Sequence, residues 1–139
     1  MDTAQIENLF IEYEKAFNDL DIKTSAEFFA DTFISAGPKG TIAQNKKDFL
    51  KKAEQASAFY RSVGQSSAKI ISKHIIPISD QYTMVTVHWG VTFEKTGDKL
   101  TEFDVSYIIY QPGDEPSIIL FIAQEAMKEL GLLNELNPA

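Results

Sequence analysis

The stretch from Met84 to Glu125, MVTVHWGVTFEKTGDKLTEFDVSYIIYQPGDEPSIILFIAQE, constrains the fold more than any other part of this chain. Apolar residues alternate with other residues through most of it, which is typical of β-strands. Gly97-Asp98 separates two such runs, and a two-residue loop that begins with Gly indicates a type II′ hairpin turn. Because loop length fixes how the flanking strands pair, this dipeptide predicts the register at the centre of a sheet.

In that register, Val91 lies opposite Asp104 and Trp89 lies opposite Ser106. A carboxylate and a hydroxyl then share one sheet face with an apolar row: Val85, Val87, Trp89, Val91 and Phe93. An apolar wall with a few polar groups is the usual lining of a small-molecule pocket. A three-residue loop at the same point would flip the parity and place Asp104 with His88 instead.

The bulk composition predicts one folded domain over residues 1–139. A chain of 139 residues can bury one proper core but is too short for two. Its hydrophobic content of 44% excludes wholesale disorder. The formal net charge of -7 argues against nucleic acid as a partner, because phosphate binding depends on clustered Lys and Arg.

Several classes of chemistry are excluded by missing residues and motifs. The chain has no cysteine, which removes disulfides and thiolate chemistry, and it has no G-x-G-x-x-G or phosphate loop for a nucleotide cofactor. The segment MDTAQIENLF lacks the basic start and apolar core of a signal peptide. No run approaches the roughly 18 to 20 apolar residues of a membrane span. We therefore expect a cytoplasmic protein with no membrane contact and no cofactor.

The first half of the chain has helical periodicity. Apolar residues recur at helical spacing over Ile6–Leu20, and a short second helix is expected after Asp21. A turn at Gly37–Gly40 leads to a third helix, for which Thr41 and Gln44 are the predicted caps.

From Ser66 onward the period changes to two. The pattern predicts strands over 68–78, 82–95, 100–110 and 117–125, and a final helical turn over 126–133. Helices followed by a meandering antiparallel sheet predict an α+β fold, with the helices packed on one face of the sheet.

Several segments resemble the nuclear transport factor 2-like superfamily. They are YEKAFNDLDIKTSAEFFAD and FFADTFISAGPKG near the start, FDVSYIIY on a strand, and ILFIAQEAMKELGL at the end. The chain looks most like the SnoaL-like branch of this superfamily, which also includes ketosteroid isomerase and scytalone dehydratase. The resemblance covers nearly the whole chain and implies a cone-shaped barrel made from a strongly curved antiparallel sheet. It does not imply one activity, because this fold carries many unrelated functions.

Compared with ketosteroid isomerase, the chain keeps one of three catalytic groups. The isomerase has a Tyr in its first helix that donates to an oxyanion, and Tyr13 stands at that place. Its Asp base corresponds to Gly37, and its protonated Asp corresponds to Ser106. Two of the three groups are replaced, which argues against steroid isomerisation.

Asp104 and Tyr13 are the candidate catalytic residues. A carboxylate enclosed by Trp89, Val91 and helix side chains would be desolvated, which suits it to act as a general base. The alternative is structural: Asp104 bonds a backbone amide or Tyr13 and has no chemical role.

A ring of mostly aromatic side chains is predicted to line the same pocket as ligand contacts: Trp89, Ser106, Phe17, Phe29, Phe33, Tyr60 and Phe121. They could stack on a flat ligand, or they could simply fill the core. By the same register His88 lies opposite Tyr107 and on the other face from Asp104, so no His–Asp pair is expected. No metal site is expected either, since ligands do not converge.

The other sheet face is also predicted to be apolar, which favours a homodimer through that outer face. Its predicted contact residues are Phe103, Val105, Tyr107, Ile118, Leu120 and Ile122. Two functional hypotheses follow. The first is a protein that binds a small apolar ligand of unknown identity, either without catalysis or as a cofactor-free isomerase, cyclase or dehydratase. The second is a non-catalytic dimeric module whose own side chains fill the cavity.

Overall fold

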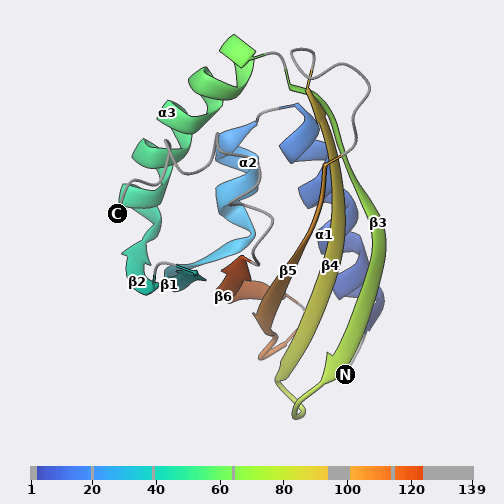
Figure 1. Cartoon of the computed structure of the whole chain (residues 1–139). Helices are drawn as coiled ribbons and strands as arrows, with labels where there is room; N and C mark the ends of the chain where they lie inside the picture. Colours follow the sequence, from blue (N-terminus) through green and yellow to red (C-terminus); the bar gives the residue numbers. More distant parts are fainter. Residues whose placement is uncertain are drawn as a thin grey trace.

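The computed structural model describes residues 3–19, 21–38, 40–63, 65–93, 101–113 and 115–123. Within these ranges three helices and six strands follow in the order α1 (Thr3–Asn18), α2 (Ile22–Glu27), β1 (Phe29–Gly37), β2 (Gly40–Asn45), α3 (Lys46–Val63), β3 (Gln65–Pro77), β4 (Tyr82–Phe93), β5 (Thr101–Tyr110) and β6 (Ser117–Ala123) (Figure 1). The predicted α+β class is therefore confirmed. The Gly97-Asp98 turn and the predicted helical turn over 126–133 lie outside the described residues.

The six strands form one sheet in the order β2-β1-β6-β5-β4-β3. The run from β3 to β6 is an antiparallel meander, as expected, and β1 and β2 form a further antiparallel pair. In contrast, β1 pairs with β6 in parallel. The expected antiparallel sheet is therefore mostly antiparallel, with β1 against β6 as the parallel pair among the described strands. A parallel pair needs a long connection, and α3 and four strands separate β1 from β6 in the chain.

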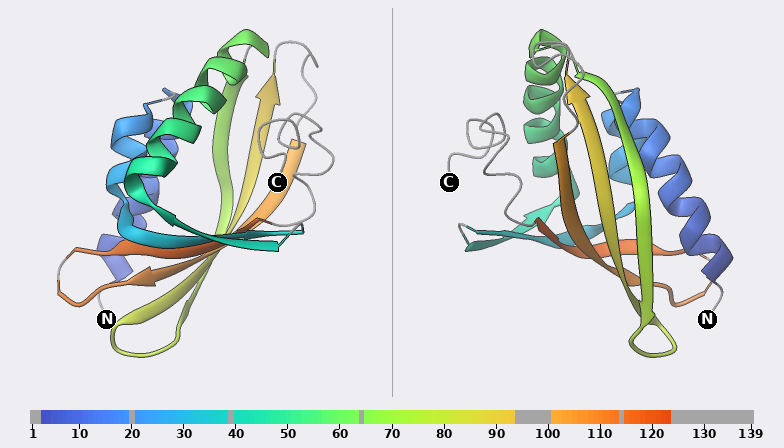
Figure 2. Two further views of the ribbon diagram at one scale, coloured as in Figure 1. Left: turned by 90° about the vertical axis from the view of Figure 1, so that its left-hand side faces the viewer. Right: turned by 45° about the vertical axis from the view of Figure 1, so that its right-hand side comes forward.

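The sheet is strongly curved, and the helices lie on its concave side. The long strands β3 and β4 run the height of the molecule, while β1, β2 and β6 cross them at a steep angle (Figure 2). The helices α1, α2 and α3 lie along the inside of this bend. None of the helices in the described ranges is long and apolar enough to cross a bilayer.

Local hydrogen bonds start the two later helices. Asp21 caps α2, because its carboxylate accepts from the Thr24 backbone N–H at 3.3 Å and from the Thr24 hydroxyl at 2.7 Å. For α3 the cap is Asn45, whose Oδ1 accepts from the Asp48 backbone N–H at 2.8 Å. The predicted caps Thr41 and Gln44 were wrong: both belong to β2, where their backbones pair with β1.

The register between β4 and β5 differs from the predicted one by three positions. Trp89 pairs with Phe103, not with Ser106, and His88 pairs with Asp104. Since the shift is odd, it exchanges the two faces of β5. The reason is burial: the observed register places a second apolar set of side chains next to the apolar face of β4, whereas the predicted one would bury Asp104 and Ser106 there.

The resulting core combines both strands with the helices. On β4 the buried residues are Thr83, Val85, Val87, Trp89 and Val91, and on β5 they are Val105, Tyr107 and Ile109. Ile6, Leu9 and Phe10 of α1 pack over them. Each side chain of this size contributes roughly 1.5 to 3 kcal/mol when fully buried.

The edge strand β3 is capped by side chains of α1. The Asn18 side-chain amide bonds the Ala68 backbone in the way that a neighbouring strand would. Its Nδ2 donates to the Ala68 carbonyl at 2.5 Å, and its Oδ1 accepts from the Ala68 N–H at 2.6 Å. One turn earlier, Glu14 Oε2 accepts from the Ile70 N–H at 2.6 Å. The helix thus covers backbone groups that would otherwise offer an open edge to another chain.

The Asn18 contact predicts a measurable loss of stability. Asn18→Ala removes both hydrogen bonds to Ala68 and leaves the Ala68 N–H and carbonyl without these partners. The free energy of unfolding, measured by urea denaturation, should fall by about 2 kcal/mol. Asn8→Ala, at an exposed position of the same helix, is the matched control and should change it by less than about 0.5 kcal/mol. Equal effects of the two substitutions would contradict the edge-capping role.

Candidate functional site

An aromatic cluster fills the space between the sheet and the helices, and Tyr13 stands at its centre. The Tyr13 ring lies 6.0 to 6.3 Å, centroid to centroid, from five other rings: Phe10, Phe28, Phe29, Trp89 and Tyr107. Rings at such distances and tilted angles pack favourably. We call these six residues, with Phe17, Phe33, Phe49 and Phe121 that touch them, the interior cluster.

A short hydrogen-bond chain crosses this cluster. The Trp89 indole Nε1 donates to the Tyr107 hydroxyl at 3.2 Å. Tyr107 is also hydrogen-bonded to Tyr13, and either phenol can be the donor of that bond. The three polar hydrogens of these residues thus make two hydrogen bonds, which leaves one phenol proton for another acceptor.

Burial keeps both phenols neutral. Burial raises the pKa of Tyr13 to about 12, although the hydrogen bond from Tyr107 partly opposes the rise. Burial also raises the pKa of Tyr107 well above its ordinary value. Both side chains are therefore hydrogen-bond donors and acceptors at ordinary pH, and neither is a base.

The structure brings most of the predicted pocket residues together. Tyr13 and Trp89 are in contact, and the predicted ligand-contact residues Phe17, Phe29, Phe33 and Phe121 belong to the same cluster. Tyr60 lies on α3, but its side chain is outside the described residues.

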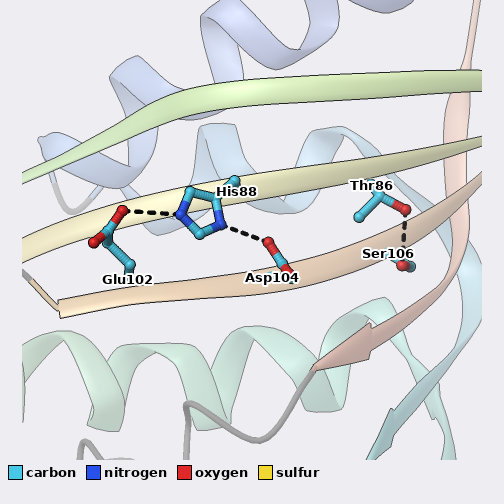
Figure 3. A network of polar contacts seen from close by, with 5 residues as sticks. All are labelled: Thr86, His88, Glu102, Asp104 and Ser106. Carbon is cyan, nitrogen blue, oxygen red and sulfur yellow. Dashed lines mark hydrogen bonds and ion pairs between the residues drawn. The ribbon is translucent and has the colours of Figure 1, made fainter.

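Asp104 and Ser106 do not face this interior, so their predicted place in the pocket was wrong. Both point to the outer, convex side of the sheet (Figure 3). Ser106 instead shares a hydrogen bond of 3.0 Å with Thr86, its neighbour on β4. The error follows directly from the register. Among the described residues the buried polar side chains are Thr83 and Gln111, so none of the described carboxylates is buried in the core.

Tyr107 is the interior residue that the sequence analysis placed on the wrong face. Its predicted neighbours were the outer-face residues, but it pairs with Val85 and is 4% exposed. The alternation of Phe103, Val105, Tyr107 and Ile109 is a signal for the inward position of Tyr107. Burying this apolar set is more favourable than burying Asp104 and Ser106, which the register predicted from Gly97-Asp98 requires.

Two amide side chains bring unsatisfied acceptors to the described core. Within the described ranges, the Oε1 atoms of Gln44 and Gln111 are buried without a hydrogen-bond partner. The amide nitrogen of Gln111 does have a partner, since Nε2 donates to Gln5 Oε1. Such carbonyl oxygens favour a bound hydroxyl, amine or water as a partner.

On the outer face, His88 bridges two carboxylates (Figure 3). Its Nδ1 lies 2.6 Å from Asp104 Oδ1, and its Nε2 lies 3.0 Å from Glu102 Oε1. Carboxylates only accept, so both ring nitrogens must carry protons to satisfy both contacts, which makes the ring an imidazolium. We call these three residues the His88 cluster. The expectation that no His–Asp pair would form was wrong, for the same reason of register.

The two carboxylates raise the pKa of His88, mainly through the hydrogen bond to Asp104 and then through that to Glu102. The side chains of the cluster remain accessible, with exposed fractions of 34% for His88, 51% for Glu102 and 49% for Asp104. No group of three or more His, Asp or Glu side chains within the described ranges is placed to hold a metal ion.

A second feature of the outer face is an apolar row. It takes one residue from each of five neighbouring strands, and each is the register partner of the next: Ile76, Met84, Ile108, Leu120 and Ile34. Ile76 and Ile34 are 38% and 39% exposed. The predicted apolar outer face is thus real, but its residues differ. Val105, Tyr107 and Ile118 are buried in the core, whereas Leu120 lies on the outer face beside Ile34.

Known proteins share both the sequence pattern and the fold. The family model described as NTF2-like protein (DUF6841) matches residues 3–126. An NTF2-like protein of unknown function from Shewanella oneidensis superposes with a TM-score of 0.73 at 17% identity, covering 90% of this chain and all of its own. A protein with a cystatin-like fold from Nostoc punctiforme gives 0.70 at 13% identity, covering 88% of this chain and 90% of its own.

A ketosteroid isomerase-like protein from Erwinia carotovora atroseptica gives a TM-score of 0.64 at 16% identity, covering 87% of this chain and 93% of its own. No curated protein matches the sequence. Identities this low show the fold alone. The family match covers most of the chain, so the protein belongs to this NTF2-like family and the predicted resemblance is confirmed.

The buried phenol of Tyr13 predicts alkaline destabilisation. Tyrosine ionises near pH 10 in the unfolded chain but near 12 at this position, so the stability is present below about pH 10 and is lost as pH rises toward 12. Between about pH 9 and 11 the free energy of unfolding should fall by about 1.4 kcal/mol through Tyr13. Urea denaturation at both pH values would show this as a shallower pH dependence in Tyr13→Phe. An identical pH dependence in both proteins would contradict the burial of this hydroxyl.

Proposed function

We propose that this NTF2-like protein binds a small, flat, largely apolar molecule in the space held by the interior cluster. The ligand carries a carbonyl or similar acceptor, to which the Tyr13 hydroxyl donates. The observation that carries the proposal is the hydrogen-bond chain that joins Trp89, Tyr107 and Tyr13, because its three polar hydrogens make two hydrogen bonds and leave one phenol proton for an outside acceptor. Aromatic walls with a few fixed polar groups are what small-molecule sites use.

Binding alone fits the described residues better than acid–base catalysis. A cofactor-free isomerase, cyclase or dehydratase needs a base near its substrate. The candidate for that role, Asp104, faces outward and is paired with His88. Tyr13 and Tyr107 stay protonated, so they orient or polarise a carbonyl but do not remove a proton from its neighbour.

The alternative function is that of a dimeric module whose interior needs no ligand. The close spacing of the aromatic rings favours it: Phe29 and Phe33 are 4.7 Å apart, and Phe29 and Phe49 are 5.0 Å apart. The two functions differ in one measurable respect. A module would exclude apolar probes from the environment of Trp89, whereas a binding protein would admit them.

Trp89 provides the test because it is the single tryptophan of the chain and lies in the interior cluster. Two probes of matched shape are 1-tetralone, which has a carbonyl, and tetralin, which lacks it. Titration of the tryptophan fluorescence should show 1-tetralone binding about five- to tenfold more tightly, the value of one neutral hydrogen bond. Tyr13→Phe should abolish this preference without abolishing tetralin binding.

Tyr82→Phe, at the outer face, is the matched control and should leave the preference unchanged. Binding of both probes with equal affinity to the unmodified protein would contradict the role of Tyr13. Binding of neither would favour the self-filled module.

We also propose that the protein is a homodimer joined through the outer sheet face. The apolar row supports this, because five apolar side chains lie in one line across the outer face of the sheet. A continuous apolar patch of this kind is removed from water when another apolar surface packs against it. A two-fold contact presents the same row from both copies, so one patch satisfies both partners. Of the interface residues expected from the sequence, the row keeps Leu120.

Substitution at the centre of the row tests the dimer. Met84→Glu would bury an unpaired carboxylate in the contact and should raise the dimer dissociation constant by more than about 100-fold. Sedimentation equilibrium measures it directly. Ile11→Glu, on α1 and 61% exposed, makes the same chemical change away from the row and should leave the dimer intact. A monomeric unmodified protein at tens of micromolar would contradict the proposal.

A further inference from the structure

We propose that protonation of His88 controls the pairing of two copies through the outer sheet face, with the imidazolium form favouring the dimer. This inference rests on the homodimer proposed above. The two are separable, however, because the apolar row supports dimerisation whatever the state of His88, and the His88 cluster is a feature of each copy alone.

The cluster joins two strands at the outer face. His88 comes from β4, and Glu102 and Asp104 come from β5, one on each side of the ring (Figure 3). Asp104 is also the direct register partner of His88. Both ring nitrogens are therefore occupied by acceptors of the same protomer, and the ring is not available as a free base. What can change is the charge of the cluster.

The cluster lies close enough to the apolar row to be affected by dimerisation. His88 follows Met84 by four residues on β4, which places it about 13 Å along the strand. A contact of standard size buries about 800 Å² on each partner, equivalent to a circle of roughly 16 Å radius. A contact centred on the row thus reaches the cluster at its margin.

The neighbouring strand β3 also brings ionisable side chains to this face. On β3, Lys69 pairs with Gly90, which in turn pairs with Glu102, and His74 pairs with Thr86. The helices cover the opposite face of the sheet.

The charge of the cluster is one positive and two negative, or -1, when His88 is protonated, and -2 when it is neutral. A two-fold contact brings two such clusters into one interface, for a total of -2 or -4. Carboxylates without a cation partner are costly to remove from water, and like charges repel across the contact. The protonated form therefore favours the dimer.

The direction of the pH dependence follows from the same contacts. Asp104 first and Glu102 second raise the pKa of His88 above its ordinary value of 6.5. This raised pKa already belongs to the folded monomer, and the proposed dimer raises it further. The favourable contribution to dimerisation is therefore complete below the pKa of the monomer and is lost as pH rises through the higher pKa of the dimer. Dimerisation should thus weaken between about pH 6 and pH 8.5.

The experiment is sedimentation velocity over a concentration series at about pH 6 and about pH 8.5. For the unmodified protein we expect the dimer dissociation constant to rise about tenfold or more, which corresponds to one unit of pKa difference between dimer and monomer. His88→Gln, which cannot gain a charge, should change by less than about twofold. His74→Gln removes the other histidine of this face and should keep the full pH response.

A second variant tests the same role of the cluster if His88→Gln does not fold. Glu102→Gln combined with Asp104→Asn removes the negative charges, so the cluster carries one positive charge when His88 is protonated and none when it is neutral. The dimer of this variant should therefore be weaker at pH 6 than at pH 8.5, the reverse of the unmodified protein. A dimer of the unmodified protein with one dissociation constant across the range would overturn the role of His88 and leave the homodimer standing. A pH response that survives in His88→Gln would overturn it equally. A monomer at both pH values would overturn the homodimer and the control together.

Discussion

Pairing between β4 and β5 determines what each face of this molecule can do. The strands carry apolar residues at every second position, and the observed register sets those positions side by side, with Val87 against Val105 and Trp89 against Phe103. Any odd displacement would send one of the two sets to the outside and draw Asp104 and Ser106 into the core. Burial of several apolar side chains outweighs the preference of a single turn, so the helices pack over one continuous apolar surface.

The separation of charge from the interior follows from this pairing. Inside, a short chain of hydrogen bonds joins Trp89, Tyr107 and Tyr13. Burial also keeps these two phenols neutral, so the described part of the interior holds a phenol donor and no buried carboxylate. Outside, the His88 cluster remains accessible and charged. This arrangement favours binding of a small apolar ligand in the interior, and control of dimerisation by the charge of the His88 cluster on the outer face.

Sequence reasoning located most elements of the fold but was weaker on how they join. The helical period from Ile6 onward and the period of two after Ser66 reflect local backbone geometry, and both were right. The caps of α3 were misplaced because Thr41 and Gln44 satisfy the capping pattern as well as Asn45 does, and only the pairing of β2 with β1 distinguishes them. The parallel contact of β1 with β6 joins residues about ninety positions apart, as in Phe29 with Ile118, and no local pattern encodes it.

By itself, the sequence determined the α+β class, the family resemblance, and an aromatic interior that includes Tyr13, Trp89 and Phe29. These properties depend on which residues are apolar and at what spacing, and the spacing is visible in the chain. Only the tertiary structure decided on which face Asp104, Ser106 and Tyr107 lie. A face depends on the parity of strand pairing, and that parity was set by the total apolar surface buried against α1, α2 and α3 rather than by any one turn.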